Sequence, residues 1–302
     1  MKKTLIIDSN NLLYRIFYVN RARNTDVNLM YMFLNCIKSY TKMIGGADNI
    51  IAVWDSRLCR GQPNFRRVAK ETDYKGNRDK EGLEEAHILD DQIQAAIQYL
   101  GGLNMFPYRM EADDVIAWLT HKQKDREYTI VTVDKDMYQL INENVCIFSP
   151  IKKIMVNKTN FSQVAGVNLD QFLQYKALVG DKSDNIPGIP RVGHKTAHKL
   201  LKHGIEKTLS KEHLEIYNKN IQLMDLSYGY NVHDGETESY QHQYDKLSEC
   251  CMDIKKFKQA CLHNAVYQIA NNVNDWVEPF NPSKEKVPNV VNLIKSLNIT
   301  NT

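Results

Sequence analysis

Five carboxylates lie within one short stretch of the chain and have the residue types that bind metal ions. They are Glu111, Asp113, Asp114, Asp134 and Asp136. Two such charges about 6 Å apart repel by roughly 3 kcal/mol at an effective dielectric constant near 20, so a group of this size would not stay ionised without cations. Because every candidate ligand atom is an oxygen, the expected cation is a hard divalent metal ion.

A helix followed by a strand would bring these acids together. Apolar residues recur at helical spacing at positions 112, 115, 116 and 119, so the acids of the Glu-Ala-Asp-Asp run fall in the first helical turn, where the helix dipole favours negative charge. Residues 128–133 form an apolar stretch that predicts a buried strand delivering Asp134 and Asp136 to its carboxyl end. Alternate positions of an extended chain share a face, so these two aspartates can point the same way. Taken alone, Glu-Ala-Asp-Asp is better explained as an ordinary acidic helix start.

Two further strands are expected to end at aspartates. Residues 3–8 predict a strand that ends at Asp8 and turns into a helix, and residues 49–54 predict a strand that ends before Asp55. If these strands are parallel, four separate elements present acids at the same edge of one sheet. Aspartate also commonly caps a helix after a strand, and for Asp8 or Asp55 singly that alternative is about equally good.

A basic segment follows over residues 57–78. It contains Arg57, Arg60, Arg66, Arg67, Lys70, Lys75 and Arg78 against only two acids, with Phe65 and Tyr74 interleaved. Basic side chains bind phosphates and aromatic rings stack on bases, so the segment resembles a clamp for a single strand. Taken alone, a charge run is more often a solvated face. Residues 84–100 then predict a helix that returns the chain to the sheet, with positions 88, 92, 95, 96 and 99 along its length.

Residues 169–179 predict a helix, and residues 186–201 have the form of a helix-hairpin-helix. Gly188 and Gly193 would permit its tight turn, and the free N–H groups near Lys195 would grip a phosphate. The same run nearly spells a P-loop, but His194 intervenes and no strand precedes it. His194 and His198 are expected to be surface histidines, because zinc would need a third ligand.

Composition sets the broad class. The 302 residues have room for one large or two ordinary domains, and a net charge of +3 does not by itself indicate a nucleic-acid partner. The six cysteines show no C-x-x-C pattern and are expected to be reduced thiols. The apolar run after Met1 is too short for a signal peptide, so we expect no membrane association and a cytoplasmic location, in a bacterial or phage-infected cell.

Together these motifs resemble the 5′ nuclease, or flap endonuclease, family, including the 5′ nuclease domain of bacterial DNA polymerase I and the free-standing phage enzymes. The resemblance covers roughly residues 1–230 and rests on Asp8, Asp55, Tyr74-Lys-Gly-Asn-Arg78, Glu-Ala-Asp-Asp, Asp134-x-Asp136 and residues 180–197. It implies an α/β, Rossmann-like nuclease domain with a mostly parallel sheet over residues 1–168, crossed by a helical arch at about 57–100. A helical helix-hairpin-helix (H3TH) DNA-binding domain at 169–275 and a linker and tail at 276–302 would follow.

The resemblance also implies roles for individual residues. Two Mg²⁺ or Mn²⁺ ions would be held by Asp8, Asp55, Glu111, Asp113, Asp114, Asp134, Asp136, Asp181 and Asp184. The inward orientation of Asp113 rests on the resemblance alone, because on an ideal helix it lies about 160° from Glu111. Lys75 and Arg78 would bind the scissile phosphate, and Arg15 matches a basic position in the phage members, with an ordinary surface arginine as the equal alternative. DNA contacts would come from Arg66, Arg67, Lys70 and Tyr74 on the arch, and from Gly188, Gly193, Lys195, Thr196 and Lys199 on the hairpin, aided by K⁺.

The function expected from this resemblance is a structure-specific 5′ nuclease acting as a flap endonuclease and 5′-3′ exonuclease in replication or repair. Its substrates would be branched or nicked duplex DNA with a 5′ flap and RNA–DNA hybrid, including RNA primers, and the protein would act as a monomer. One alternative is a DNA-binding scaffold without catalysis. Another is a dehalogenase-type phosphatase with Asp8 as nucleophile, which would need an acid where the chain has Asn10. The apolar stripe of Val290, Val291, Ile294 and Leu297 is expected to dock on its own protein, with binding to a clamp or single-strand binding protein as the minority alternative.

Overall fold

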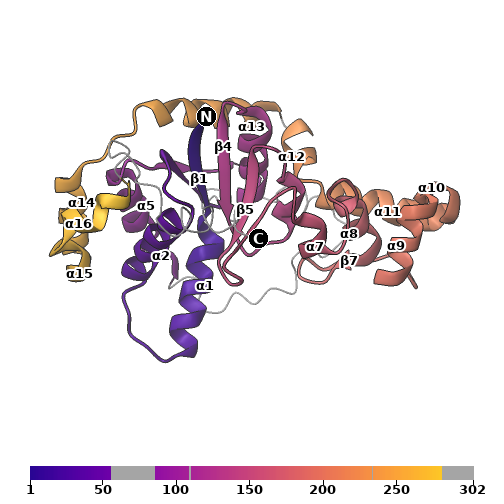
Figure 1. The fold of residues 1–302 in the computed structure, drawn as a ribbon, viewed down its shortest axis with the longest axis horizontal. Helices are drawn as coiled ribbons and strands as arrows, with labels where there is room; N and C mark the ends of the chain where they lie inside the picture. Colours follow the sequence, from indigo (N-terminus) through magenta and orange to yellow (C-terminus); the bar gives the residue numbers. More distant parts are fainter. Residues whose placement is uncertain (56–85, 109, 233, 281–302) are drawn as a thin grey trace, which may run out of the picture.

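In the computed structural model, which describes residues 1–55, 86–108, 110–232 and 234–280, a six-stranded sheet lies between two layers of helices (Figure 1). The strands are β1 (Lys2–Asp8), β2 (Asn49–Val53), β3 (Leu103–Met105), β4 (Arg126–Val131), β5 (Val145–Ser149) and β6 (Ile154–Val156). Their order is β3-β2-β1-β4-β5-β6, and only the β5–β6 pair is antiparallel. The predicted α/β fold with a mostly parallel sheet is confirmed, although β3 was not predicted.

Strand β1 lies at the centre of the sheet and packs on both sides. Leu5 and Ile7 contact the apolar cluster on one face, and Ile6 contacts the cluster on the other, because side chains alternate along a strand. The chain leaves β1 towards β2 on one side, and β4 later pairs with the other side. Asp8, the last residue of β1, therefore lies at the point where the strand order reverses, which is where open α/β sheets bind ligands.

The first face of the sheet is covered by α1 (Ser9–Ala22), α2 (Leu29–Met43) and α5 (Asp90–Tyr99). The helix expected over 84–100 begins only at Asp90, and its buried apolar residues are Ile93, Ala96 and Ile97. Ile88, which was expected within this helix, lies before it and is 69% exposed. A turn at positions 88 and 89 precedes the helix.

The chain returns to this face after residue 250. The returning helices are α14 (Ile254–His263), α15 (Tyr267–Ala270), α16 (Val273–Val277) and the short 3₁₀ helix η4 (Glu278–Phe280). The chain turns between α14 and α15 at Ala265, which has a φ of 56°. Trp276, Val277 and Phe280 are buried in the same core as Leu5 and Ile7. The first residues of the expected linker at 276–302 therefore belong to the folded body.

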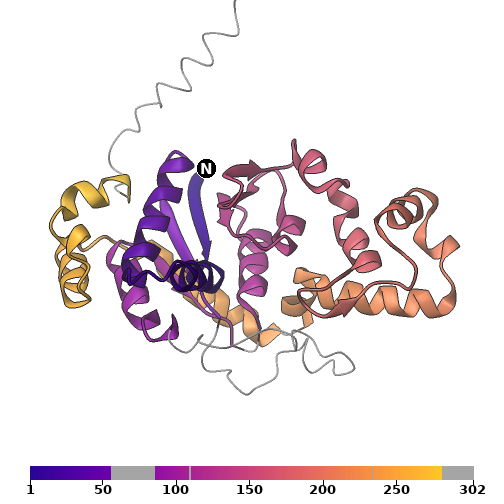
Figure 2. The same cartoon turned by 90° about the horizontal axis from the view of Figure 1, so that it is seen from below.

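The second face is covered by α6 (Ala112–Lys122), α12 (Leu226–Val232) and α13 (Asp234–Asp245), and the predicted buried stripe of α6 is confirmed. A separate core joins α8 (Phe172–Val179), α9 (His194–His203), α10 (Ile205–Thr208) and α11 (Lys211–Met224). These helices lie at the opposite end of the molecule from α14–α16 (Figures 1 and 2). Within residues 169–275, α9, α10 and α11 lie in this separate core, α12 and α13 pack on the second face of the sheet, and α14–α16 pack on the first face.

Short elements complete the described chain. They are η1 (Asp136–Leu140), α7 (Phe161–Ala165), η2 (Leu169–Gln171), β7 (Gly180–Asp181), β8 (Ile186–Pro187) and η3 (Lys246–Ser248). Cys36, Cys146, Cys250, Cys251 and Cys261 are free thiols. Within the described ranges, no helix has the length and apolar character needed to span a bilayer. The basic segment at 57–78 and the apolar stripe at 290–297 lie outside these ranges.

Candidate metal centre at the carboxyl edge of the sheet

Asp8 is the residue at which β1 ends and α1 begins. It is 5% exposed, and it caps the helix because its Oδ1 accepts the backbone N–H of Asn11 at 3.3 Å. Its Oδ2 accepts the Thr132 hydroxyl at 2.9 Å. The capping alternative raised for Asp8 is therefore real, and it coexists with a buried position at the carboxyl edge of the sheet.

Asp55 follows β2 and joins two neighbouring elements. Its backbone N–H donates to Asn10 Oδ1 at 2.7 Å, and its Oδ1 accepts the N–H of Ala112 at 3.0 Å. Ala112 is the first residue of α6, so Asp55 accepts one of the N–H groups that a helix start leaves unpaired. Asn10 is buried and acts as a structural amide, which also removes the acid position that a dehalogenase-type phosphatase would need.

The acids at the start of α6 differ in their surroundings. Asp114 is completely buried, and its Oδ2 accepts the backbone N–H of Glu111 at 3.0 Å, which closes the first turn. Glu111 and Asp113 are half-buried. Asp114 thus has a clear structural role in the helix start, whatever further role it has at the sheet edge.

A chain of hydrogen bonds continues from Asp8 into the turn after β4. The Thr132 hydroxyl that binds Asp8 accepts the N–H of Asp134 at 3.0 Å, and Asp134 Oδ1 accepts the N–H of Asp136 at 2.8 Å. Asp136 then begins η1. The local turn, rather than a simple continuation of the strand, determines where these two aspartates lie.

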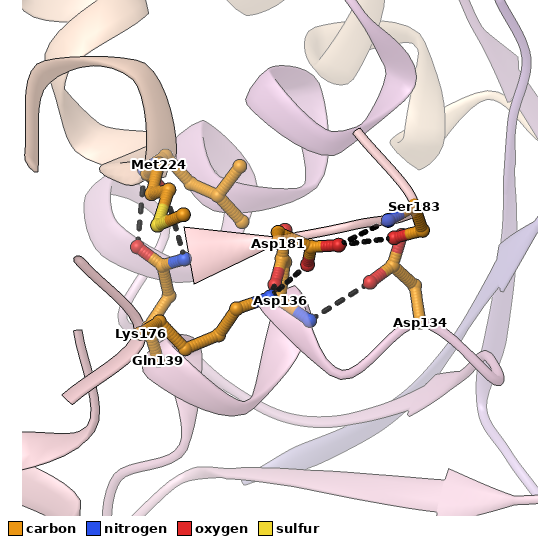
Figure 3. A network of polar contacts seen from close by, with 8 residues as sticks. Asp134, Asp136, Gln139, Lys176, Asp181, Ser183 and Met224 are labelled. Carbon is orange, nitrogen blue, oxygen red and sulfur yellow. Dashed lines mark hydrogen bonds and ion pairs between the residues drawn. The ribbon is translucent and has the colours of Figure 1, made fainter. Parts of the chain in front are cut away.

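Lys176 of α8 binds two of the carboxylates and was not singled out from the sequence (Figure 3). Its ammonium group donates to Asp136 Oδ1 and to Asp181 Oδ2. Asp181 Oδ1 also accepts the N–H and the hydroxyl of Ser183, at 2.7 and 2.5 Å. This lysine joins the helical hairpin to the sheet edge. No local signal in the sequence marks Lys176, because its helix, Phe-Leu-Gln-Tyr-Lys-Ala-Leu-Val, mixes apolar and polar residues in an ordinary way.

The electrostatics of the edge show a surplus of negative charge. Burial raises the pKa of Asp8 to about 7, with Asp134 and Asp55 adding to the effect and the Thr132 hydroxyl opposing it. Burial likewise raises the pKa of Asp136 to about 6, with Asp134 adding and Lys176 opposing. For Asp181 burial is outweighed by hydrogen bonds from Lys176 and Ser183, which lower its pKa to about 2. Near neutral pH, a cation would therefore compete for the protons of Asp8 and Asp136.

The donors fit a hard divalent cation in kind, because all of them are carboxylates at one sheet edge. As the side chains are placed, however, no group of three or more histidine, cysteine, aspartate and glutamate residues within the described chain could hold a metal ion. Asp8 faces Thr132 and Asn11, while Asp136 and Asp181 face Lys176. Coordination would require these carboxylates to exchange protein donors for the ion.

The hairpin between α8 and α9 carries Asp181 and Asp184. Strands β7 and β8 pair Gly180 with Pro187. Gly180 has a φ of +81°, and a Cβ at Gly188 would lie 2.2 Å from the carbonyl oxygen of Val179, so both positions require glycine. Asp184 is buried at 8% exposure.

Gly193 differs from the other two glycines of the hairpin. It has a φ of −95°, and a Cβ added there would meet no other atom within 4 Å, so neither its backbone conformation nor its surroundings require glycine. Gly193 caps α9, and Lys195, Thr196 and Lys199 are exposed on that helix. His194 and His198 are also exposed, as expected, and contact the ring of Tyr175.

The remaining predicted site residues are not brought to this edge by any described contact. Arg15 donates from its guanidinium group to the hydroxyl of Tyr40 on α2. Lys75, Arg78, Arg66, Arg67, Lys70 and Tyr74 lie outside the described residues. Their roles stay predictions from the sequence.

Comparison with known proteins agrees with this arrangement. Residues 3–166 match the family model of the 5'-3' exonuclease N-terminal resolvase-like domain, and residues 167–223 match its C-terminal SAM fold. The chain is 30% identical over 238 residues to the 5'-3' exonuclease of Buchnera aphidicola subsp. Schizaphis graminum, covering 74% of this chain and 80% of that protein. It is 31% identical over 206 residues to the thermostable DNA polymerase I of Thermus thermophilus, covering 66% of this chain but only 24% of the polymerase.

A solved structure shares the fold. The D15 flap endonuclease of bacteriophage T5, in a complex with DNA and metal ions, superposes with a TM-score of 0.67 at 20% identity, covering 82% of this chain and 100% of that one. The two family models together span the sheet, with its acidic edge, and the hairpin that Lys176 joins to it. On this evidence the chain belongs to the 5'-3' exonuclease family.

Proposed function

We propose that this protein is a structure-specific 5′ nuclease that hydrolyses phosphodiesters at 5′ flaps and 5′ ends, including RNA primers, during DNA replication or repair. The observation that supports the proposal best is the juxtaposition at one sheet edge. Asp8 ends β1, and Asp134 and Asp136 follow β4. Lys176 joins this acidic edge to the helical hairpin. The 5'-3' exonuclease relatives support the same reaction class.

In the proposed reaction, two bound Mg²⁺ or Mn²⁺ ions would activate water and stabilise the attacking and leaving oxygens. The ligands would come from the acids predicted for this role, and Asp8 and Asp136 among them have raised pKa values. The full set is Asp8, Asp55, Glu111, Asp113, Asp114, Asp134, Asp136, Asp181 and Asp184. Without metal ions, Lys176 would neutralise Asp136 and Asp181. With metal ions bound, it would donate a hydrogen bond to one of these two carboxylates. The protein thus supplies the negatively charged carboxylates, holds them in place and keeps most of them partly or fully buried.

The hairpin would bind the duplex beside this edge. The first N–H groups of α9 have no partner within the helix, and Lys195 and Lys199 add positive charge on the exposed side of the same helix. A K⁺ ion at this turn is part of the proposal. The basic segment at 57–78, with Lys75 and Arg78, would bind the displaced 5′ strand and the scissile phosphate.

The direct test uses a 5′-labelled flap duplex and a matched blunt duplex. We expect Mg²⁺-dependent release of the flap, with EDTA abolishing it, and slower Mg²⁺-dependent cleavage from the 5′ ends of the blunt duplex. Mn²⁺ should replace Mg²⁺. Tight binding of the flap without cleavage under either metal would instead favour the scaffold function, and release of free phosphate from a nucleotide would favour a phosphatase.

Salt dependence should separate the two proposed DNA contacts. Each contact with a phosphate should steepen the fall of log affinity with log salt by about 0.9 on duplex and about 0.7 on a single strand. Alanine at Lys195 and Lys199 should flatten the slope on duplex and flap alike, whereas alanine at Arg66 and Lys70 should flatten it only with a 5′ single strand. Binding would be measured in Ca²⁺ over a KCl series. An equal change of the duplex slope in both double variants would contradict the division.

A further inference from the structure

We propose that Asp90, His87 and Tyr14 act through Asn10 as positioning residues for Asp55. The proposal rests on the proposed function, in which Asp55 is one of the metal ligands. None of the four residues was singled out from the sequence as part of the site, apart from Asn10 as the position where a phosphatase would have an acid. Asn10 and Tyr14 belong to α1, His87 lies just before α5, and Asp90 is the first residue of α5.

The five residues form a continuous chain of hydrogen bonds. Asp90 Oδ2 lies 2.7 Å from His87 Nδ1, and His87 Nε2 lies 2.9 Å from the Tyr14 hydroxyl. Asn10 Nδ2 donates to the Tyr14 oxygen at 3.4 Å, and Asn10 Oδ1 accepts the N–H of Asp55 at 2.7 Å. Asp90 and Asn10, near the two ends of the chain, are only 2% and 4% exposed. Buried polar networks of this kind favour a single arrangement when their members are bonded.

The atoms involved determine the direction of every bond except the one between His87 and Tyr14, which depends on the state of the imidazole. An ionised carboxylate only accepts, so His87 Nδ1 carries a hydrogen and donates to Asp90. In the neutral imidazole, Nε2 then accepts from the Tyr14 hydroxyl, which leaves a tyrosine lone pair for the Asn10 amide N–H. When the imidazole is protonated, Nε2 donates to the tyrosine oxygen, and a second lone pair still accepts from Asn10. In either state the Asn10 oxygen is turned towards Asp55.

The consequence reaches the acidic edge at Asp55. Asn10 holds its backbone, while the first N–H of α6 holds Oδ1 of its carboxylate. These two bonds set the direction in which the carboxylate projects, beside Asp8. Loss of the Tyr14 hydroxyl would leave the Asn10 amide free to rotate, so its oxygen would no longer be directed at the Asp55 N–H. The ring of Tyr14, which packs edge-on against His87 at 5.5 Å, would stay in place.

The experiment measures metal binding without DNA. Free Mn²⁺ would be counted by electron paramagnetic resonance in titrations of wild type, Tyr14→Phe, Asp90→Asn and Asp90→Ala, with a thermal melt of each. We expect about 10-fold weaker Mn²⁺ binding for Tyr14→Phe and Asp90→Ala, at the lower end of what residues behind metal ligands contribute. Asp90→Asn should retain most of the affinity, because its amide oxygen still accepts from His87. Tyr18→Phe, on the same helix and 41% exposed, is the matched control and should bind as wild type.

Two outcomes would overturn the proposal. Tyr14→Phe could bind Mn²⁺ as tightly as Tyr18→Phe does, or it could lower the melting temperature with unchanged Mn²⁺ affinity, which would make the network merely structural. Asp55→Asn separates this failure from a failure of the proposed function. Weaker binding in Asp55→Asn with unchanged binding in Tyr14→Phe rejects only the positioning role, whereas unchanged binding in Asp55→Asn rejects Asp55 as a ligand and the positioning role with it.

Discussion

Asp134→Asn is expected to lower cleavage of a 5′ flap by about 10²–10³-fold, the range for losing one preorganised electrostatic contact, while DNA affinity stays unchanged. Asp134 acts electrostatically on both Asp8 and Asp136, so it lies between the two carboxylates with raised pKa values. Asparagine keeps the Oδ1 acceptor that holds the N–H of Asp136, and the substitution therefore removes charge without opening the turn. Single-turnover cleavage at saturating Mg²⁺ and flap binding in Ca²⁺ measure the two effects.

Asp170→Asn provides the matched control, because Asp170 is an exposed acid in η2 and its substitution makes the same change of charge. It should cleave as wild type. Unchanged cleavage in Asp134→Asn at saturating Mg²⁺ would remove Asp134 from the catalytic centre. A loss of DNA affinity equal to the loss of cleavage would instead place Asp134 in the binding of substrate.

Asp134→Asn should also raise the melting temperature of the metal-free protein at pH 7. Folding raises the pKa of Asp8 from 3.8 to about 7, so ionisation of this group costs folding free energy as the pH rises through that interval. Removing the Asp134 charge lowers the pKa of Asp8 and of Asp136 and reduces that cost. Lower activity combined with higher stability is the pattern expected where a cluster of like charges is retained for function.

The sheet and the position of its acids could be predicted because strand ends are local features. Asp8 ends β1, Asp55 follows β2 and Asp134 follows β4, and these strands are parallel neighbours or next neighbours in the sheet. Periodicity then identified the buried side of α6 correctly. In each case a few adjacent residues carry the whole signal.

What the sequence did not predict depends on contacts between distant segments. Lys176 reaches Asp136, which is 40 residues away, and Asn10 reaches Asp55, which is 45 residues away. No local pattern distinguishes such a lysine or asparagine from others. The division of residues 169–275 has the same origin, because α12–α16 pack on the sheet rather than on the neighbouring helices α8–α11.

The glycines of the hairpin give the largest expected difference in stability between two identical substitutions. Gly188→Ala would place a Cβ 2.2 Å from the oxygen and 2.5 Å from the carbon of the Val179 carbonyl, and both are backbone atoms that cannot rotate away. We expect a loss of about 3 kcal/mol, the upper part of the range for overpacking, and a fall of about 6–12 °C in melting temperature. Gly193→Ala should stay within about 0.5 kcal/mol of wild type, since nothing lies within 4 Å of the new methyl group.

Duplex binding separates the two glycines in a second way. Gly188→Ala should weaken binding because the displaced hairpin no longer holds the start of α9, and the Ile189 N–H bond to the Leu178 carbonyl at 2.9 Å should be lost with it. Gly193→Ala should also weaken binding, but at unchanged stability, because Gly193 caps the helix end proposed to receive a phosphate and a methyl group there would keep the phosphate away. Thermal melts followed by circular dichroism and duplex titrations in Ca²⁺ measure both. If Gly193→Ala bound duplex as tightly as wild type, the helix start of α9 would not be in close contact with the phosphate backbone.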